Sequence, residues 1–220
     1  MIRPALAALL TGLTLIAASG FVEARSGPVE AVVTDEKGKP VEDAVVSLTS
    51  LGAPAPPPAK VIVDQIDKEF VPFVLPVYVG ASVSFPNRDN IRHHVYSFSS
   101  PKKFELPLYI GTPAAPVVFD KPGVVALGCN IHDWMLAYIY VVATPYFAKT
   151  AGSGKAQLDG LSPGAWEARV WHPRLRAETE KTATPVTLAG GEPGQVSFVV
   201  ALKPDRRPIR RPGYEGAQGN

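Results

Sequence analysis

The chain has 220 residues, a formal net charge of +2 and 19% charged residues, so its charge balance gives no reason to expect a nucleic-acid or anionic-membrane partner. Proline (23 residues) and glycine (19 residues) are frequent, which is typical of many short strands joined by turns. No long helical period is present. The composition therefore predicts an all-β protein.

The N-terminus has the pattern of a secretory signal. A positive head, Met1-Ile2-Arg3, precedes the apolar run Ala5–Ala18, and Val22-Glu23-Ala24 offers a cleavage site. The apolar run is shorter than the about 20 residues that a membrane-spanning helix needs. We therefore predict a cleaved signal peptide at residues 1–24, export to the periplasm and no stable membrane insertion afterwards.

The first strands expected in the mature chain are Val29–Thr34 and Val41–Thr49, joined by a turn that contains Lys37-Gly38. A proline-rich stretch, Ala53–Lys60, then predicts a stiff and extended connection. Strand-like segments follow as far as Val142.

Two of the central segments have features of their own. Phe70–Val79 contains prolines, which predict an edge or bulged strand. Ala81–Phe85 alternates in strand fashion and leads through a polar turn to His93, His94 and the strand Val95–Phe98. Near the C-terminus, Val196–Leu202 is the expected closing strand. The basic tail 204–220 has arginines among proline and glycine and is expected to be disordered.

A short loop between two predicted strands contains three side chains that could bind a metal ion. Cys129 is the single cysteine of the chain, and His132 and Met135 follow it at intervals of three residues. A lone cysteine in an exported protein has no internal disulfide partner, and metal ligation is one of its remaining roles. Thiolate and thioether suit Cu(I), and imidazole suits both copper oxidation states. Zinc is a weaker fit, because thioether is not among its usual ligands.

A trigonal copper site needs a second imidazole. His93 and His94 are the candidates, and both precede a strand. Because successive strand side chains point to opposite faces, regular strand geometry directs only one of them at the metal.

The pattern from Phe70-x-Pro72 through Cys129-x-Ile131-His132-x-x-Met135 resembles the cupredoxins, the small blue-copper proteins. It is most similar to the amicyanin and plastocyanin type and to cupredoxin-like proteins labelled for methylamine utilisation. The resemblance implies a Greek-key β-sandwich at 60–145 that binds one copper ion, Cu+ or Cu2+, per chain. Matched by position, the metal ligands are His93, Cys129, His132 and axial Met135.

One departure from the family leaves the upstream ligand open. His94 falls where many cupredoxins have an asparagine that braces the ligand loop, so the choice between His93 and His94 is not settled by the motif. The resemblance also implies that His132 reaches the surface as the electron port. Trp134 and Leu136 are then the candidate residues of a docking patch.

The segments on either side of the copper motif resemble the two parts of a carboxypeptidase-regulatory-like β-sandwich. The segment that resembles the first part of that sandwich lies within 25–52, and the segment that resembles the second part lies within 150–203. This predicts a copper domain that is inserted in, or flanked by, a second small β-sandwich. The alternative is that the flanking strands extend a single enlarged sandwich.

These observations predict a one-electron carrier rather than an enzyme, with a dehydrogenase as donor and a cytochrome-type protein as acceptor. Two alternatives remain. One is a periplasmic copper carrier or storage protein, and the other is a β-sandwich binding module with a structural metal.

Overall fold

The computed structural model describes residues 27–50, 57, 59–113 and 115–207, and in these residues it consists of β-strands and one short 3-10 helix, η1 (Thr179–Thr182). This confirms the all-β prediction. No helix in these ranges is long and apolar enough to cross a membrane. The predicted signal peptide, most of the proline-rich connection and the tail beyond residue 207 lie outside the described residues.

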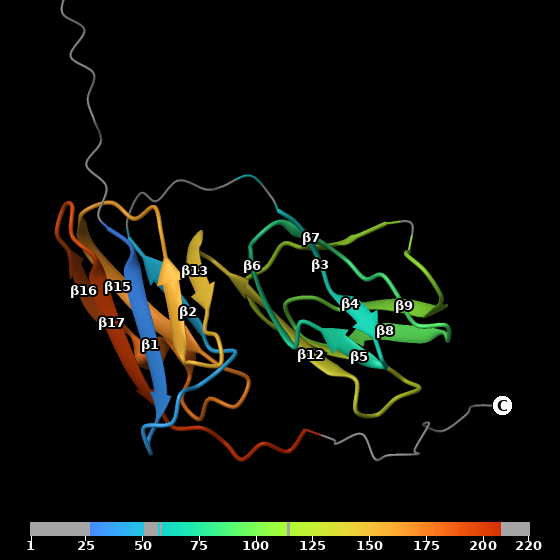
Figure 1. The fold of residues 1–220 in the computed structure, drawn as a ribbon. Helices are drawn as coiled ribbons and strands as arrows, with labels where there is room; N and C mark the ends of the chain where they lie inside the picture. The colour runs from blue at the N-terminus through green and yellow to red at the C-terminus, as the bar shows by residue number, and fades with distance from the viewer. Residues whose placement is uncertain (1–26, 51–56, 58, 114, 208–220) are drawn as a thin grey trace, which may run out of the picture.

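Two β-sandwiches lie side by side (Figure 1). The first has a three-stranded sheet in the order β14-β1-β17 and a four-stranded sheet in the order β13-β2-β15-β16. Its strands are β1 (Val29–Asp35), β2 (Val45–Thr49), β13 (Tyr146–Lys149), β14 (Lys155–Leu158), β15 (Gly164–Trp171), β16 (Thr184–Leu188) and β17 (Gly194–Val200).

Alternation of apolar and polar residues forms the first sandwich. In β1, Val29, Ala31 and Val33 are fully buried. In β17, Val196 and Phe198 are buried, while Ser197 between them is exposed. These side chains pack against the inner face of the other sheet in one apolar cluster. The period of two thus places a core between the two sheets.

The second sandwich has a three-stranded sheet in the order β10-β7-β3, a five-stranded sheet in the order β6-β12-β11-β8-β9 and the hairpin β4-β5. Its strands are β3 (Lys60–Ile62), β4 (Asp64–Ile66), β5 (Glu69–Val71), β6 (Val74–Tyr78), β7 (Ala81–Ser84), β8 (His93–Ser97), β9 (Phe104–Tyr109), β10 (Val117–Phe119), β11 (Gly123–Gly128) and β12 (Leu136–Val142). In the chain, all of them lie between β2 and β13 of the first sandwich.

The proline-containing segment Phe70–Val79 is divided between β5 and β6, with Pro72 in the gap. β6, which contains Pro76, is an edge strand of the five-stranded sheet. The sequence predicted an edge position. Proline has no backbone N–H, so it cannot take part in full hydrogen bonding to neighbouring strands on both sides.

An apolar and aromatic cluster joins the two sandwiches. Trp171, the last residue of β15, stacks on Tyr140 of β12 with 4.6 Å between ring centroids, and it also contacts Tyr138. Val45, Val74 and Val142 are buried in the same cluster. β12 therefore begins at the loop 129–135 and ends at the contact between the sandwiches.

Candidate metal centre

The loop 129–135 closes a hairpin between β11 and β12. Gly128, the last residue of β11, lies opposite Leu136, the first residue of β12. Within the loop, the N–H of Met135 donates a hydrogen bond to the carbonyl of His132 at 3.0 Å. The paired strands hold both ends of the loop, so Cys129, His132 and Met135 lie on one closed turn of chain.

The upstream histidines lie on opposite faces of β8. His93, Val95 and Ser97 point inward and are 0%, 0% and 1% exposed. His94 points to the other face, where its Nε2 lies 2.9 Å from Oε1 of Glu105. The alternation of the strand thus separates the two imidazoles, and His93 is the one on the side of Cys129.

His93, Cys129 and His132 form the candidate metal centre. One nitrogen of each imidazole and the Cys129 Sγ all lie within 4.8 Å of one another. The Sγ of Cys129 is 4.0 Å from Nδ1 of His132. The ring centroids of His93 and His132 are 4.9 Å apart. All three side chains are buried. The structure therefore brings the imidazole of His93 next to Cys129 and His132, although His93 precedes them by 36 and 39 residues in the sequence.

The His93 ring has one nitrogen engaged and one free for a metal. Its Nε2 lies 2.7 Å from Oδ2 of Asp89. Its Nδ1 is buried and has no hydrogen-bond partner. An unpaired buried nitrogen costs free energy, and a metal ion would use its lone pair. This free nitrogen, next to a thiol and a second imidazole, fits the donor set of copper.

The surroundings of Cys129 favour the thiolate. Burial raises the pKa of its thiol, but the His93 side chain and the backbone N–H groups of His94, Ile131 and His132 lower it below its usual value. Hydrogen bonds to the charged form stabilise that form. A metal binds the deprotonated sulfur. The backbone hydrogen bonds of the loop therefore favour the form of Cys129 that a metal would bind.

Met135 is 2% exposed and belongs to the same apolar cluster as Cys129 and Trp134. Its position after the turn at His132 keeps its thioether in the core of this sandwich. Its role as the axial ligand stays a prediction.

The expectation that His132 reaches the surface is wrong. His132 is 2% exposed, and the ring of Trp134 lies against it with 5.1 Å between centroids. The indole Nε1 donates a hydrogen bond to the carbonyl of Lys68 at 3.0 Å. Trp134 therefore packs against the histidine, and its indole is fixed to the turn between β4 and β5.

The sequence did not point to Asp89 as a partner of the centre. Burial raises the pKa of its carboxyl, but hydrogen bonds from His93 and from the backbone of Lys68 and Asp67 lower it below its usual value. The signal was present in the spacing, because Asp89 precedes His93 by four residues within a polar turn.

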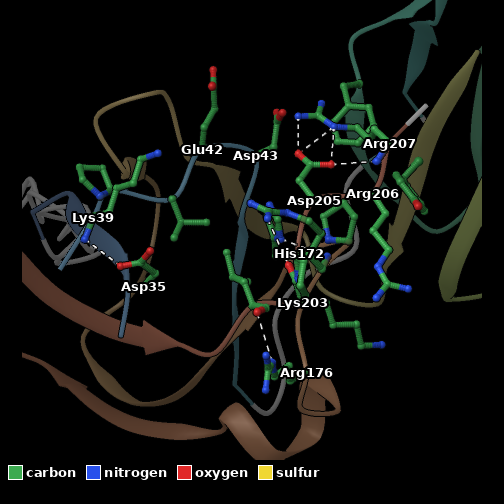
Figure 2. A pocket seen from close by; sticks show the side chains of 18 of the residues that line it. Asp35, Lys39, Glu42, Asp43, His172, Arg176, Lys203, Asp205, Arg206 and Arg207 are labelled. Carbon is green, nitrogen blue, oxygen red and sulfur yellow. Dashed lines mark hydrogen bonds and ion pairs between the residues drawn. The ribbon is translucent and has the colours of Figure 1, made fainter. Parts of the chain in front are cut away.

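A groove of about 1130 Å³ runs beside the two sandwiches. Figure 2 shows its charged lining, in which Asp205 is paired with Arg207 and both acidic and basic side chains point into the space. Leu136, the residue after Met135, lies at one side of it. None of His93, Cys129 and His132 lines this groove, so the buried centre is separate from it.

No protein-family model matches the chain, and no curated protein matches it. Several solved structures do. A copper-containing nitrite reductase from Thermus scotoductus is 28% identical, with a TM-score of 0.36 over 51% of this chain and 28% of that chain. A purple cupredoxin from Nitrosopumilus maritimus is 23% identical, with a TM-score of 0.32 over 38% of this chain and 99% of that chain. A reduced amicyanin variant is 21% identical, with a TM-score of 0.34 over 46% of this chain and all (100%) of that chain.

These matches cover about half of the chain or less, and the nitrite reductase is matched over 28% of its own length. None of them supports the expected resemblance of the flanking segments to a carboxypeptidase-regulatory-like sandwich. The chemistry of the centre rests on the geometry of its own residues.

Proposed function

We propose that this chain is a type 1 copper protein that carries one electron between redox proteins. The observation that carries the proposal is the buried triangle of Cys129, His93 and His132, whose ligand atoms lie within 4.8 Å of one another. One thiolate and two imidazoles in a trigonal set, with a thioether nearby, are the ligands of electron-transfer copper sites. In this proposal Met135 is the long axial ligand.

Copper bound here would supply a one-electron couple between its cuprous and cupric forms. The chain's own contribution is to hold the donors in place. Cys129 and His132 lie on a loop whose ends are paired in a β-hairpin, and His93 lies on the neighbouring strand β8. Donors fixed on a sheet move little when the charge of the site changes, and small rearrangement favours fast electron transfer.

Burial of the ligands favours an electron carrier over a copper donor. His93, Cys129 and His132 are 0%, 4% and 2% exposed, and Trp134 covers His132. A protein that hands copper to an acceptor must let the acceptor's ligands reach the ion. In this chain such access requires displacement of Trp134 from the core.

We further propose that the protein is exported to the periplasm, where a dehydrogenase-type donor and a cytochrome-type acceptor would be its partners. The signal-like residues 1–24 support export. We propose no catalysis by this chain alone. In the described part of the chain, the three residues above are the one cluster of histidine, cysteine and acidic side chains that could hold a metal.

The test is to purify the mature protein, load it with Cu(II), and record its visible and EPR spectra. We expect an intense thiolate-to-copper absorption band that reductant bleaches reversibly. Cys129→Ser removes the sulfur and should abolish the band. His94→Gln is the matched control: it removes an imidazole whose Nε2 contacts Glu105, keeps the backbone N–H of His94 that faces the Cys129 sulfur, and should retain the band.

A pale complex in the wild-type protein would contradict the proposal. So would a wild-type complex that passes copper rapidly to a chelating acceptor and shows no reversible couple. That second outcome would favour the copper-carrier role instead.

A further inference from the structure

The hairpin turn between β4 and β5 consists of two residues, Asp67 and Lys68. Asp67 and Lys68 both have left-handed conformations, with φ of 54° and 61°. Neither residue is glycine, and each such conformation costs about 1 kcal/mol or more for a residue with a side chain. Both residues of a two-residue type I′ hairpin turn take this conformation, and contacts from outside the turn can offset its cost.

Asp89 stabilises it. The N–H of Asp67 donates to Oδ1 of Asp89 at 2.8 Å, and the N–H of Lys68 donates to Oδ2 at 2.8 Å. The backbone N–H of Asp89 in turn donates to Oδ1 of Asn87 at 3.0 Å. The Asp89 side chain is 14% exposed. A carboxylate fixed by two N–H donors has little freedom to rotate.

The third contact of this carboxylate is with the metal centre. Its Oδ2 lies 2.7 Å from Nε2 of His93, which is the shortest of the three contacts. A carboxylate oxygen accepts, so Nε2 must carry the proton. In a neutral imidazole the lone pair is then on Nδ1. That nitrogen is the buried one without a hydrogen-bond partner.

We infer that Asp89 is a positioning residue of the centre: it fixes the orientation and tautomer of His93 and places a negative charge behind this ligand. The inference rests on the proposed copper-binding function and deepens it. A carboxylate behind a ligating histidine raises the basicity of the ligand. It also favours the more highly charged cupric state, so Asp89 lowers the reduction potential.

The simpler explanation is that Asp89 only supports the turn, because two of its three contacts are with the turn backbone. The two roles predict different results. A supporting role affects folding stability alone, whereas the positioning role affects the His93 ring and the potential. The same turn also holds Trp134 through the Lys68 carbonyl, so stability by itself does not distinguish them.

The first experiment compares the reduction potentials of two copper-loaded variants by voltammetry. Asp89→Asn removes the negative charge beside His93 and should raise the potential while the thiolate-to-copper band remains. Asp64→Asn is the matched control. It removes the same charge from the adjacent strand β4, where Asp64 pairs with Arg88 at 3.0 Å and does not contact His93. An equal shift in both variants, or no shift in either, would overturn the inference.

The second experiment uses the wild-type apo-protein and needs neither copper nor a folded variant. The ¹⁵N chemical shifts of the His93 ring at pH 8 report which nitrogen carries the proton. We expect protonated Nε2 and unprotonated Nδ1. The opposite tautomer, a mixture, or a ring protonated at both nitrogens would overturn the inference. If the wild-type protein binds copper without a thiolate band, the proposed function fails, but this measurement still decides the role of Asp89.

Discussion

The indole ring of Trp134 lies against the imidazole of His132, with 5.1 Å between the ring centroids. The indole Nε1 is fixed by a hydrogen bond to the carbonyl of Lys68 at 3.0 Å. Trp134 is itself 9% exposed. The loop 129–135 therefore packs an aromatic ring against its own histidine, and a hydrogen bond to the turn between β4 and β5 fixes that ring.

Removal of the Trp134 ring should expose the candidate centre. Trp134→Ala should lower the free energy of unfolding of the apo-protein by about 3–5 kcal/mol, the usual cost of a large-to-small change in a core. Copper should also be extracted faster by a cuprous chelator, because His132 becomes accessible. Urea denaturation and stopped-flow extraction would measure the two effects.

Trp134→Phe is the control for that experiment. It keeps an aromatic ring over His132 but loses the hydrogen bond to Lys68, which is worth about 1 kcal/mol. Its extraction rate should stay close to that of the wild-type protein. If alanine and phenylalanine gave the same extraction rate, the ring would not be a barrier to the metal.

Met135 should tune the centre rather than create it. The axial thioether of a trigonal copper site is a weak and distant ligand whose identity adjusts the potential. Met135→Leu should therefore keep the intense band and raise the reduction potential, because leucine keeps the bulk and removes the sulfur lone pair. Loss of the band in Met135→Leu would show that Met135 is needed to build the site.

Much of the candidate centre could be predicted from the sequence because three of its four predicted ligands, Cys129, His132 and Met135, are close together in the chain. The spacing of Cys129, His132 and Met135 places three donors on one loop, and strand alternation separates His93 from His94. The choice between those two histidines also had a readable signal. Val95 is apolar and points to the core, so His93, two residues before it, shares its face.

The surroundings of the ligands could not be predicted in the same way. Asp89 contacts Asp67 and Lys68 of the turn, which lie 22 and 21 residues away in the sequence, and Trp134 contacts Lys68 over 66 residues. Such contacts depend on how a hairpin packs against a loop, and no periodicity reports them. The exposure expected for His132 was wrong for this reason.

His172 should make folding stability depend on pH. It follows β15, it is 6% exposed, and its Nδ1 accepts a hydrogen bond from the N–H of Arg174. Burial, with the nearby charge of Arg174, lowers the pKa of His172 to about 4. In the unfolded chain the pKa of a histidine is about 6.5.

The sign of the effect follows from these two values. Between about pH 6.5 and pH 4 the unfolded state binds a proton that the folded state does not bind, so stability falls as the pH falls. The contribution is fully present above about pH 6.5, and about 3 kcal/mol is lost by pH 4. Urea denaturation of the wild-type protein and of His172→Gln at pH 4.5 and 7.5 measures it. The variant should lose less stability on acidification, and parallel losses would contradict the assignment.

Position 128 should require glycine, because the ring of Tyr96 occupies the space that a larger side chain at this position would need. The two residues face each other across β11 and β8, and a Cβ at Gly128 would lie 2.7 Å from the ring carbon Cζ of Tyr96 and 2.8 Å from its hydroxyl oxygen. Gly128→Ala should therefore lower the free energy of unfolding by about 1–3 kcal/mol. It should also weaken the thiolate-to-copper band, since Cys129 is the next residue in the chain.

A double-mutant cycle isolates this contact. Tyr96→Ala removes the ring, so the added methyl group of Gly128→Ala should then cost little, and the band should recover in the double variant. The coupling energy between the two sites is obtained from urea denaturation of the four apo-proteins. If the two changes were additive, the effect of Gly128→Ala would come from the backbone, and the close approach of Tyr96 would have no part in holding Cys129.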